Sequence, residues 1–166
     1  MSNKQKLYIG YYSSPFGNIL LASTKDYLTG LWFEGEKYYP KEFEQEAEIK
    51  DTPILLKAKQ WLDIYFSGVN PEFTIPIEFN GTEFQKKVWR ILMDIPYGKT
   101  VSYGEVAHLL GNIKASQAVG GAVGKNPISI IVPCHRVIAS DGSLTGYAGG
   151  LEIKQKLLNL EQMIRG

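Results

Sequence analysis

Short apolar runs separated by turn residues fill the first third of the chain. Residues 7–12, 18–23 and 28–33 are rich in β-branched and aromatic side chains, which favour extended strands. A Ser-Pro-Phe-Gly sequence and a Lys-Asp pair lie between these runs and are typical of tight turns. The pattern therefore predicts a small antiparallel sheet.

A helix is predicted after the acidic, lysine-bearing stretch of residues 34–51. Thr52 followed by Pro53 has the N-cap and first-turn chemistry of a helix, and apolar residues recur from there until Gly68 stops the pattern. Residues 69–81 are rich in proline and glycine, and they predict an extended connector between two parts of the protein.

The second half of the chain has the pattern of helices. The spacings Thr-x-x-Gln from residue 82 and Ser-x-x-Glu from residue 102 both fit a capping box, in which each side chain satisfies backbone donors at the other end. They predict helices over residues 82–94 and 102–110.

A further short helical segment is predicted over residues 113–124. Gly111 and Asn112 form a tight turn before it, which is the spacing of a helix-turn-helix. Two-helix hairpins are also common in cores, so DNA binding and core packing both stay open. Gly120 and Gly121 each cost about 1 kcal/mol relative to alanine inside a helix. The pair therefore indicates close approach by a bulky surface, either a nucleic-acid backbone or another helix.

These elements predict an α/β (α+β) fold. Residues 1–80 are expected to form a small antiparallel sheet with a helix. Residues 81–166 are expected to form a mainly helical part with the helix-turn-helix and the single cysteine.

The 166 residues are 44% apolar and 12% aromatic, which excludes a disordered chain. No apolar run approaches the ~18 residues of a membrane span, and the polar start lacks a signal-peptide core, so we expect a cytoplasmic protein with no membrane association.

Charge is distributed unevenly along the chain although the formal net charge is only +1. Residues 1–80 hold 8 Lys/Arg and 11 Asp/Glu, a charge of −3, whereas residues 81–166 hold 10 and 6, a charge of +4. The second half is therefore the better candidate for contact with a polyanion. Ordinary scatter explains this modest asymmetry equally well.

The single cysteine, Cys134, cannot form an internal disulfide, and two histidines are too few to complete a structural zinc site with it. Residues 128–132 have the pattern of a buried strand that ends at Pro133, which puts the thiol at a strand end. A thiol reacts as its thiolate and needs a nearby base or positive charge, which His135 or Arg136 can supply. Consecutive side chains on a strand point to opposite faces, so contact between Cys134 and His135 needs a bend or a bridging water.

A carboxylate on the buried side of the last helix completes a possible triad. Glu161 lies at helical spacing from the apolar residues Leu157 and Ile164, and a buried carboxylate needs a partner. A relay from Glu161 through His135 to Cys134 has the logic of nucleophile, base and orienting group. A core cysteine beside a structural Glu–Arg pair is the alternative.

The combination of motifs resembles the O6-alkylguanine-DNA alkyltransferase family over essentially the whole chain. The resemblance rests on Ile-Val-Pro-Cys-His-Arg-Val at residues 131–137, Gly-Gly-Ala at 120–122, Asn-Pro at 126–127, Gly-Tyr-x-Gly-Gly at 146–150 and Pro-Tyr-Gly-Lys-Thr-Val-Ser-Tyr-Gly at 96–104. It implies a ribonuclease-H-like domain over residues 1–80 and a DNA-binding, catalytic domain over residues 81–166. It also implies a suicide repair reaction on a flipped alkylguanine in double-stranded DNA, with O4-alkylthymine as a further possible substrate.

The resemblance also assigns roles to individual residues. Cys134 is the alkyl acceptor, His135 acts on it through a water, Glu161 orients His135, Asn126 supports the active-site turn, and Tyr103 rotates the nucleotide and protonates the departing purine. The implied substrate and DNA contacts are Gln117, Ala118, Gly120, Arg136, Val137, Tyr147, Ala148 and Gly149. The helix that begins near Gln117 is expected in the minor groove, with Gln117 in place of the arginine usual in the family. No metal or other cofactor is implied, and we expect a monomer.

Three other functions compete with this interpretation. A non-catalytic sensor of alkyl lesions would lack the cysteine that this chain has, and cysteine hydrolases have local signatures that are missing here. A transcription regulator built on the helix-turn-helix would leave the Pro-Cys-His-Arg sequence unexplained. Repair by alkyl transfer to Cys134 is therefore the function that the sequence favours.

Overall fold

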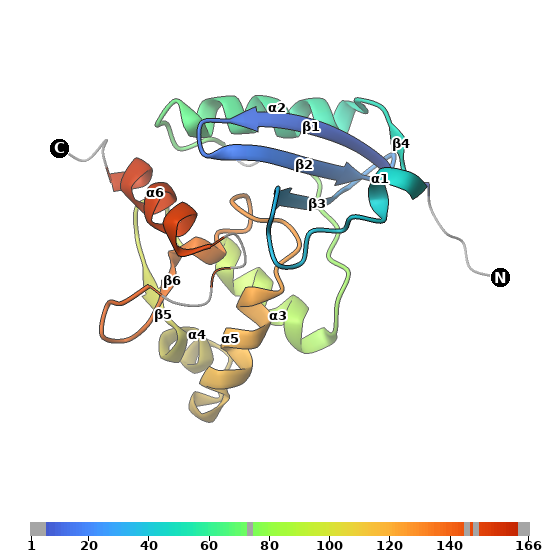
Figure 1. The fold of residues 1–166 in the computed structure, drawn as a ribbon. Coiled ribbons are helices and arrows are strands. Elements are labelled where there is room, and N and C mark those ends of the chain that lie inside the picture. The colour runs from blue at the N-terminus through green and yellow to red at the C-terminus, as the bar shows by residue number, and fades with distance from the viewer. Residues whose placement is uncertain (1–5, 73–74, 145–146, 148–149, 163–166) are drawn as a thin grey trace.

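The N-terminal part of the computed structural model is a twisted sheet with strand order β3-β2-β1-β4 (Figure 1). The structure describes residues 6–72, 75–144, 147 and 150–162. The strands are β1 (Tyr8–Ser14), β2 (Gly17–Ser23), β3 (Leu28–Phe33) and β4 (Glu48–Ile49). The first three are antiparallel neighbours, as the sequence predicts, and β4 adds a short parallel pairing with β1 that the acidic stretch did not suggest.

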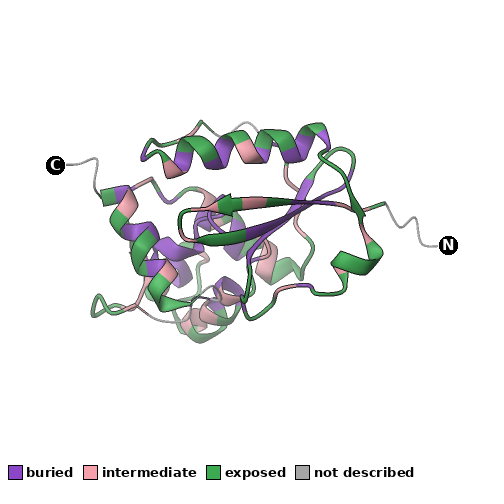
Figure 2. Cartoon of the chain, turned by 45° about the horizontal axis from the view of Figure 1, so that its top comes forward, coloured by how far each residue is buried: buried purple, intermediate pink, exposed green. Residues whose placement is uncertain are grey.

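Helix α2 (Pro53–Phe66) covers one face of this sheet (Figure 1). It begins where the sequence predicts, because the Thr52 hydroxyl accepts a hydrogen bond from the Leu55 N–H. Its buried residues form a stripe toward the sheet, which Figure 2 shows as alternating purple and green along the ribbon. The short helix α1 (Phe43–Glu46) lies against Trp32 on the other face, with ring centroids 5.7 Å apart between Trp32 and Phe43.

The C-terminal part is mainly helical. Its elements are α3 (Glu83–Met93), β5 (Val101–Ser102), α4 (Tyr103–Leu109), the 3₁₀ turn η1 (Ile113–Ala115), α5 (Ser116–Gly124), η2 (Cys134–Arg136), β6 (Val137–Ile138) and α6 (Leu151–Gln162). Both predicted capping boxes are present. Strands β5 and β6 pair in parallel and bring η2 next to the start of α4. The helix-turn-helix is α4 followed by η1 and α5.

The prediction of a buried strand over residues 128–132 is wrong. This segment is a compact turn in which the Val132 N–H donates to the Ile128 carbonyl, and Ile130 has a φ of 68°, a rare value for a β-branched residue. The physical reason is Asn126, whose amide donates to the carbonyls of Ile128 and Val132 and accepts from the Ile128 N–H. One side chain thus satisfies backbone groups that a strand would have paired in a ladder.

The turn after Asn126 is attached directly to the N-terminal sheet. The Leu31 N–H donates to the Pro127 carbonyl, and the Ser129 N–H donates to the Leu31 carbonyl. One core of buried side chains then runs from the sheet and α2 to α3, α5 and α6. The N-terminal sheet therefore helps to fix the segment that leads to Cys134. None of the helices described is long and apolar enough to cross a membrane.

Candidate active site

Cys134 begins the 3₁₀ turn η2 and is only 4% exposed. It does not lie at a strand end, but the bend after Pro133 that the sequence analysis required is present. With three residues per turn, successive side chains of a 3₁₀ helix point about 120° apart. Consistent with this, the contacts described for Cys134 and His135 include no direct hydrogen bond between them.

His135 and Glu161 form a buried pair. His135 Nε2 lies 2.5 Å from Glu161 Oε2, and both residues are 0% exposed. His135 Nδ1 is buried and has no hydrogen-bond partner among the described residues. Burial lowers the pKa of His135, against the opposing effect of Glu161, which favours a neutral ring. A neutral ring that donates from Nε2 to the carboxylate leaves a lone pair on Nδ1, where a base is needed.

Glu161 is held by donors from three parts of the chain. Arg136 donates from Nε to Oε1 at 2.8 Å and from Nη2 to Oε2 at 3.2 Å, the Gly98 N–H donates to Oε1 at 3.0 Å, and the Tyr65 hydroxyl donates to Oε2 at 2.6 Å. Burial acts to raise the pKa of Glu161, but hydrogen bonds and charge from His135 and Arg136 hold it well below its usual range. Glu161 is therefore ionised at neutral pH.

Arg136 points into the protein. Besides its two bonds to Glu161, it donates from Nη1 to the Ile95 carbonyl at 2.7 Å, and its guanidinium lies over the Tyr97 ring. All three guanidinium nitrogens thus have partners inside the protein. The DNA contact expected from the resemblance does not fit this placement, and the side chain instead stabilises the charge on Glu161.

The surroundings of Cys134 favour the thiol over the thiolate. Burial raises the pKa of Cys134 to about 12, and the negative charge of Glu36 adds to the rise. A hydrogen bond with Asn126 and the positive charge of Lys154 lower the pKa of Cys134, but they do not outweigh burial. Lys154 is itself buried and donates from Nζ to the Val137 carbonyl. A thiol in this setting needs a base at the moment of reaction.

The predicted DNA-facing residues lie on the exposed side of α5. Gln117 and Ala118 are exposed at its start and Gly120 is half-buried, and a Cβ atom at Gly120 would only reach ordinary contact distance from the Tyr103 ring, at 3.9 Å. No atom of the residues that the structure describes lies within 4 Å of a Cβ built on Gly121. Packing among these residues therefore does not require the glycine pair.

A cavity of about 290 Å³ lies beside this helix. Gly120 and Gly121 form one wall, residues 37–38 of the N-terminal part form another, and Tyr147 lines it as well. Among the other residues expected to line a base pocket, Val137 is fully buried next to η2, whereas Ala148 and Gly149 lie outside the described residues. The structure therefore places Tyr147 and the α5 glycines at one cavity.

Sequence reasoning missed three polar residues of the site. Tyr65 sits among the apolar positions of α2, so its hydroxyl gave no separate signal. Lys154 lies on the same face of α6 as Leu157 and Glu161, and this spacing could have identified it as a buried cation. Glu36 gave no pattern, because its burial depends on the loop after β3 meeting the turn at Ser129.

Comparison with known proteins identifies the family of this chain. Residues 83–163 match the DNA-binding domain, and residues 7–79 the ribonuclease-like domain, of 6-O-methylguanine DNA methyltransferase. The chain belongs to the 6-O-methylguanine DNA methyltransferase family. This confirms the family predicted from the Pro-Cys-His-Arg sequence and its neighbours.

Relatives in this family are similar over nearly their whole length. The methylated-DNA–protein-cysteine methyltransferase of Haemophilus influenzae is 44% identical to this chain, and the match covers 95% of this chain and 87% of the relative. The methylated-DNA–protein-cysteine methyltransferase of Methanosarcina acetivorans is 46% identical, and the match covers 93% of this chain and 98% of the relative. The crystal structure of Mycobacterium tuberculosis O6-methylguanine methyltransferase has a TM-score of 0.85 and 42% identity, over 94% of this chain and 93% of that one. The crystal structure of Mycobacterium tuberculosis OGT in complex with DNA has a TM-score of 0.84 and 41% identity, and the match covers 93% of this chain and 92% of that one. These structures confirm the mixed α/β fold class.

Proposed function

We propose that this methyltransferase repairs O6-alkylguanine in double-stranded DNA by moving the alkyl group irreversibly to Sγ of Cys134. That the chain is a methylated-DNA–protein-cysteine methyltransferase, which acts in DNA repair, follows from the family match and the names of its relatives. The observation that supports Cys134 as the acceptor is that the next residue, His135, forms a buried pair with Glu161. Cys134 is also the only cysteine in the sequence. The reaction consumes the protein, because the thioether that forms has no route back to a thiol.

The first step is removal of the proton from the thiol. A water between Cys134 and His135 passes this proton to Nδ1 of His135, the ring nitrogen that has no partner among the described residues. Glu161 then stabilises the imidazolium through its bond to Nε2. Because burial raises the pKa of Cys134 in the free protein, this relay supplies the base that formation of the thiolate needs.

The second step is an in-line displacement at the alkyl carbon. A bond forms between Sγ and the carbon while the bond between the carbon and O6 of guanine breaks, and the electron pair stays on the purine. The Tyr103 hydroxyl, at the first position of α4, protonates the purine nitrogen, and solvent carries the proton held by the His135 imidazolium back to the phenolate. No external alkyl donor is required, because the lesion carries the electrophilic carbon.

Access to the lesion requires base flipping, and we assign α5 to the minor groove. Its exposed Ala118 and Gly121 support this placement, since small side chains let the helix approach the sugar-phosphate walls, and the exposed Gln117 offers hydrogen-bonding groups at the start of the helix. Flipping costs a few kcal/mol of unstacking and costs less for a damaged base pair. The flipped base enters the cavity lined by Tyr147.

One copy of the chain is sufficient for this chemistry, since Cys134, His135 and Glu161 all come from the same molecule. We therefore propose a monomer. We also propose that the chain divides into two domains near residue 80, and the residue ranges of the two family matches support this division.

We propose a cytoplasmic location, because the reaction needs a reduced thiol.

Mass spectrometry tests the proposed reaction directly. The purified protein, with its thiol shown to be reduced, is incubated with an excess of a duplex that contains O6-methylguanine. We expect one methyl group per molecule, located on Cys134 by peptide mapping, and no gain in Cys134→Ala, which should still bind the lesion duplex. An unmodified wild-type protein would contradict the proposal and favour a lesion sensor.

A further inference from the structure

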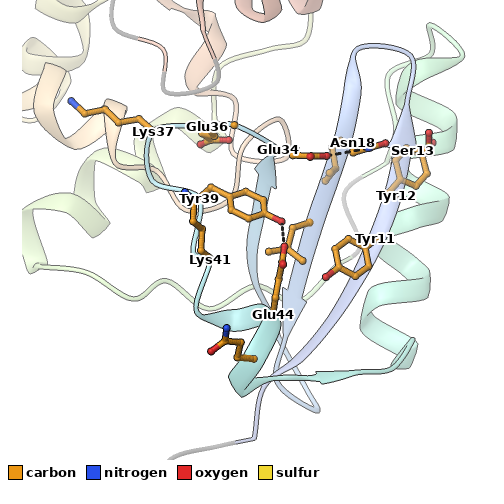
Figure 3. Close-up of a pocket in the computed structure, with 14 residues that line it drawn as sticks. Tyr11, Tyr12, Ser13, Asn18, Glu34, Glu36, Lys37, Tyr39, Lys41 and Glu44 are labelled. Carbon is orange, nitrogen blue, oxygen red and sulfur yellow. Dashed lines mark hydrogen bonds between the residues drawn. The ribbon is translucent and has the colours of Figure 1, made fainter.

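A second buried carboxyl group lies close to the active-site turn, and the mechanism does not use it. Glu36 is 5% exposed and belongs to the loop that follows β3. Figure 3 shows this loop at the edge of a large groove over the N-terminal sheet, with Lys37 beside Glu36, whereas Glu34 reaches Asn18 over the sheet. Glu36 therefore differs from its neighbour Glu34 in both burial and direction.

The Glu36 carboxyl group connects the two parts of the chain. Its Oε2 accepts from the Phe33 N–H at 2.9 Å, and its Oε1 accepts from the Ser129 hydroxyl at 3.3 Å. Ser129 belongs to the turn that Asn126 organises and that leads to Cys134. Glu36 is therefore in direct contact with the active-site turn through a hydrogen bond.

The charge of Glu36 also acts on the nucleophile. It disfavours ionisation of Cys134 in η2 and of Tyr147, while Lys154 of α6 favours the Cys134 thiolate. Burial raises the pKa of Glu36 to about 7, although the hydrogen bonds from Phe33 and Ser129 oppose the rise. The carboxyl group thus changes its charge close to neutral pH.

We propose that Glu36 is a positioning residue for alkyl transfer, which ties the active-site turn to the N-terminal sheet and whose negative charge restrains the reactivity of Cys134. This inference rests on the proposed transfer to Cys134. At acidic pH the neutral carboxyl group leaves thiolate formation unopposed. As the pH rises through 7, its charge works against the thiolate.

The test compares single-turnover alkylation rates of wild type and Glu36→Gln between pH 5.5 and 8.5. Glutamine keeps the size of the side chain, accepts from the Phe33 N–H and donates to Ser129, but it carries no charge. We expect equal rates at pH 5.5 and a Glu36→Gln rate roughly three- to tenfold higher at pH 8.5. The control Glu34→Gln removes an exposed charge from the same loop and should match wild type throughout.

A rate ratio between Glu36→Gln and wild type that stays constant with pH would overturn the proposal, because a merely structural role has no such dependence. Carbon-13 NMR of the Glu36 carboxyl group in the wild-type protein gives a second measurement that does not depend on the variant folding. We expect a midpoint near 7, and titration near the ordinary glutamate value of 4.5 would also overturn it. Absence of transfer by the wild-type protein would instead contradict the proposed function.

Discussion

The hydroxyl group of Tyr65 donates a 2.6 Å hydrogen bond to Oε2 of Glu161. Tyr65 belongs to α2 in the N-terminal part, and Glu161 belongs to α6 at the other end of the chain. The same carboxylate oxygen binds His135. The N-terminal part therefore contributes directly to the group that orients the proposed base.

Tyr65→Phe removes this bond and leaves the rest of the ring in place. A hydrogen bond to a buried charge contributes about 1.5 to 3 kcal/mol, so the free energy of unfolding should fall by that amount in urea titrations. Alkylation should also slow, because the Glu161–His135 pair loses one restraint. Tyr12→Phe is the matched control, since it removes an exposed bond of the same length to Asp63 and should cost less than about 1 kcal/mol. Equal losses in the two variants would contradict the role of Tyr65.

Glu161→Gln removes the charge that stabilises the His135 imidazolium. Loss of an effective general base costs on the order of 100-fold in rate, and we expect a decrease of that size in single-turnover alkylation. Circular dichroism at the assay temperature verifies that the variant is folded, because Arg136 loses its buried counter-charge. Glu152→Gln, at an exposed position of the same helix, should react like wild type. A Glu161→Gln rate equal to wild type would leave Glu161 with a structural role only.

Acid should destabilise the wild-type protein through Glu161. Its pKa is lower in the folded state than in the unfolded state, so the unfolded chain binds more protons as the pH falls below the ordinary glutamate value of 4.5. The stability that the ionised group contributes is present above that pH and is lost below it. Urea unfolding between pH 7 and 3 should show a steeper decline for wild type than for Glu161→Gln. Parallel declines would contradict this assignment.

The exposed glycine of α5 allows a test in which stability and binding move in opposite directions. Gly121→Ala should raise the free energy of unfolding by roughly 0.5 to 1 kcal/mol, since alanine favours a helix and its Cβ meets no atom of the described part of the chain within 4 Å. Gly121→Leu should lower affinity for duplex DNA by roughly tenfold, about 1.4 kcal/mol, in a fluorescence anisotropy titration. Gln60→Leu, which adds an exposed leucine to α2, controls for a general effect of an apolar surface residue. Unchanged affinity in Gly121→Leu would exclude close contact of this helix with DNA.

Gln117→Arg adds a charge at the start of α5, where the resemblance noted from the sequence leads us to expect an arginine. We expect the affinity of the variant for duplex DNA to be at least roughly threefold higher than that of wild type, and repair to be faster. The slope of log affinity against log salt concentration should steepen by about one released counterion. Gln45→Arg places the same charge on α1 and should change binding less. Identical titrations of Gln117→Arg and wild type would contradict the assignment of Gln117 to the DNA-facing surface.

Local patterns of the chain predicted the elements on either side of the active site. The helix capped by Thr52 and the two capping boxes appear as expected, because residues three positions away supply their hydrogen bonds. The strands near residues 8–33 appear as well, because short turns bring consecutive strands together. The position of Glu161 on the buried face of α6 also followed from helical spacing. Where the pattern of residues 128–132 indicated a strand, a side chain outside that run, Asn126, imposed a turn instead.

The sequence by itself determined the family, the presence of a single cysteine, the first three strands and the capped helices, since each depends on residue types at short separations. Only the tertiary structure brought Tyr65 to Glu161, turned Arg136 inward and buried Glu36 beside Ser129. These pairs are 25 to 96 residues apart, and no local periodicity relates such positions. Their contacts follow from packing of the sheet against the C-terminal helices, which also sets the burial that shifts the pKa values of the site.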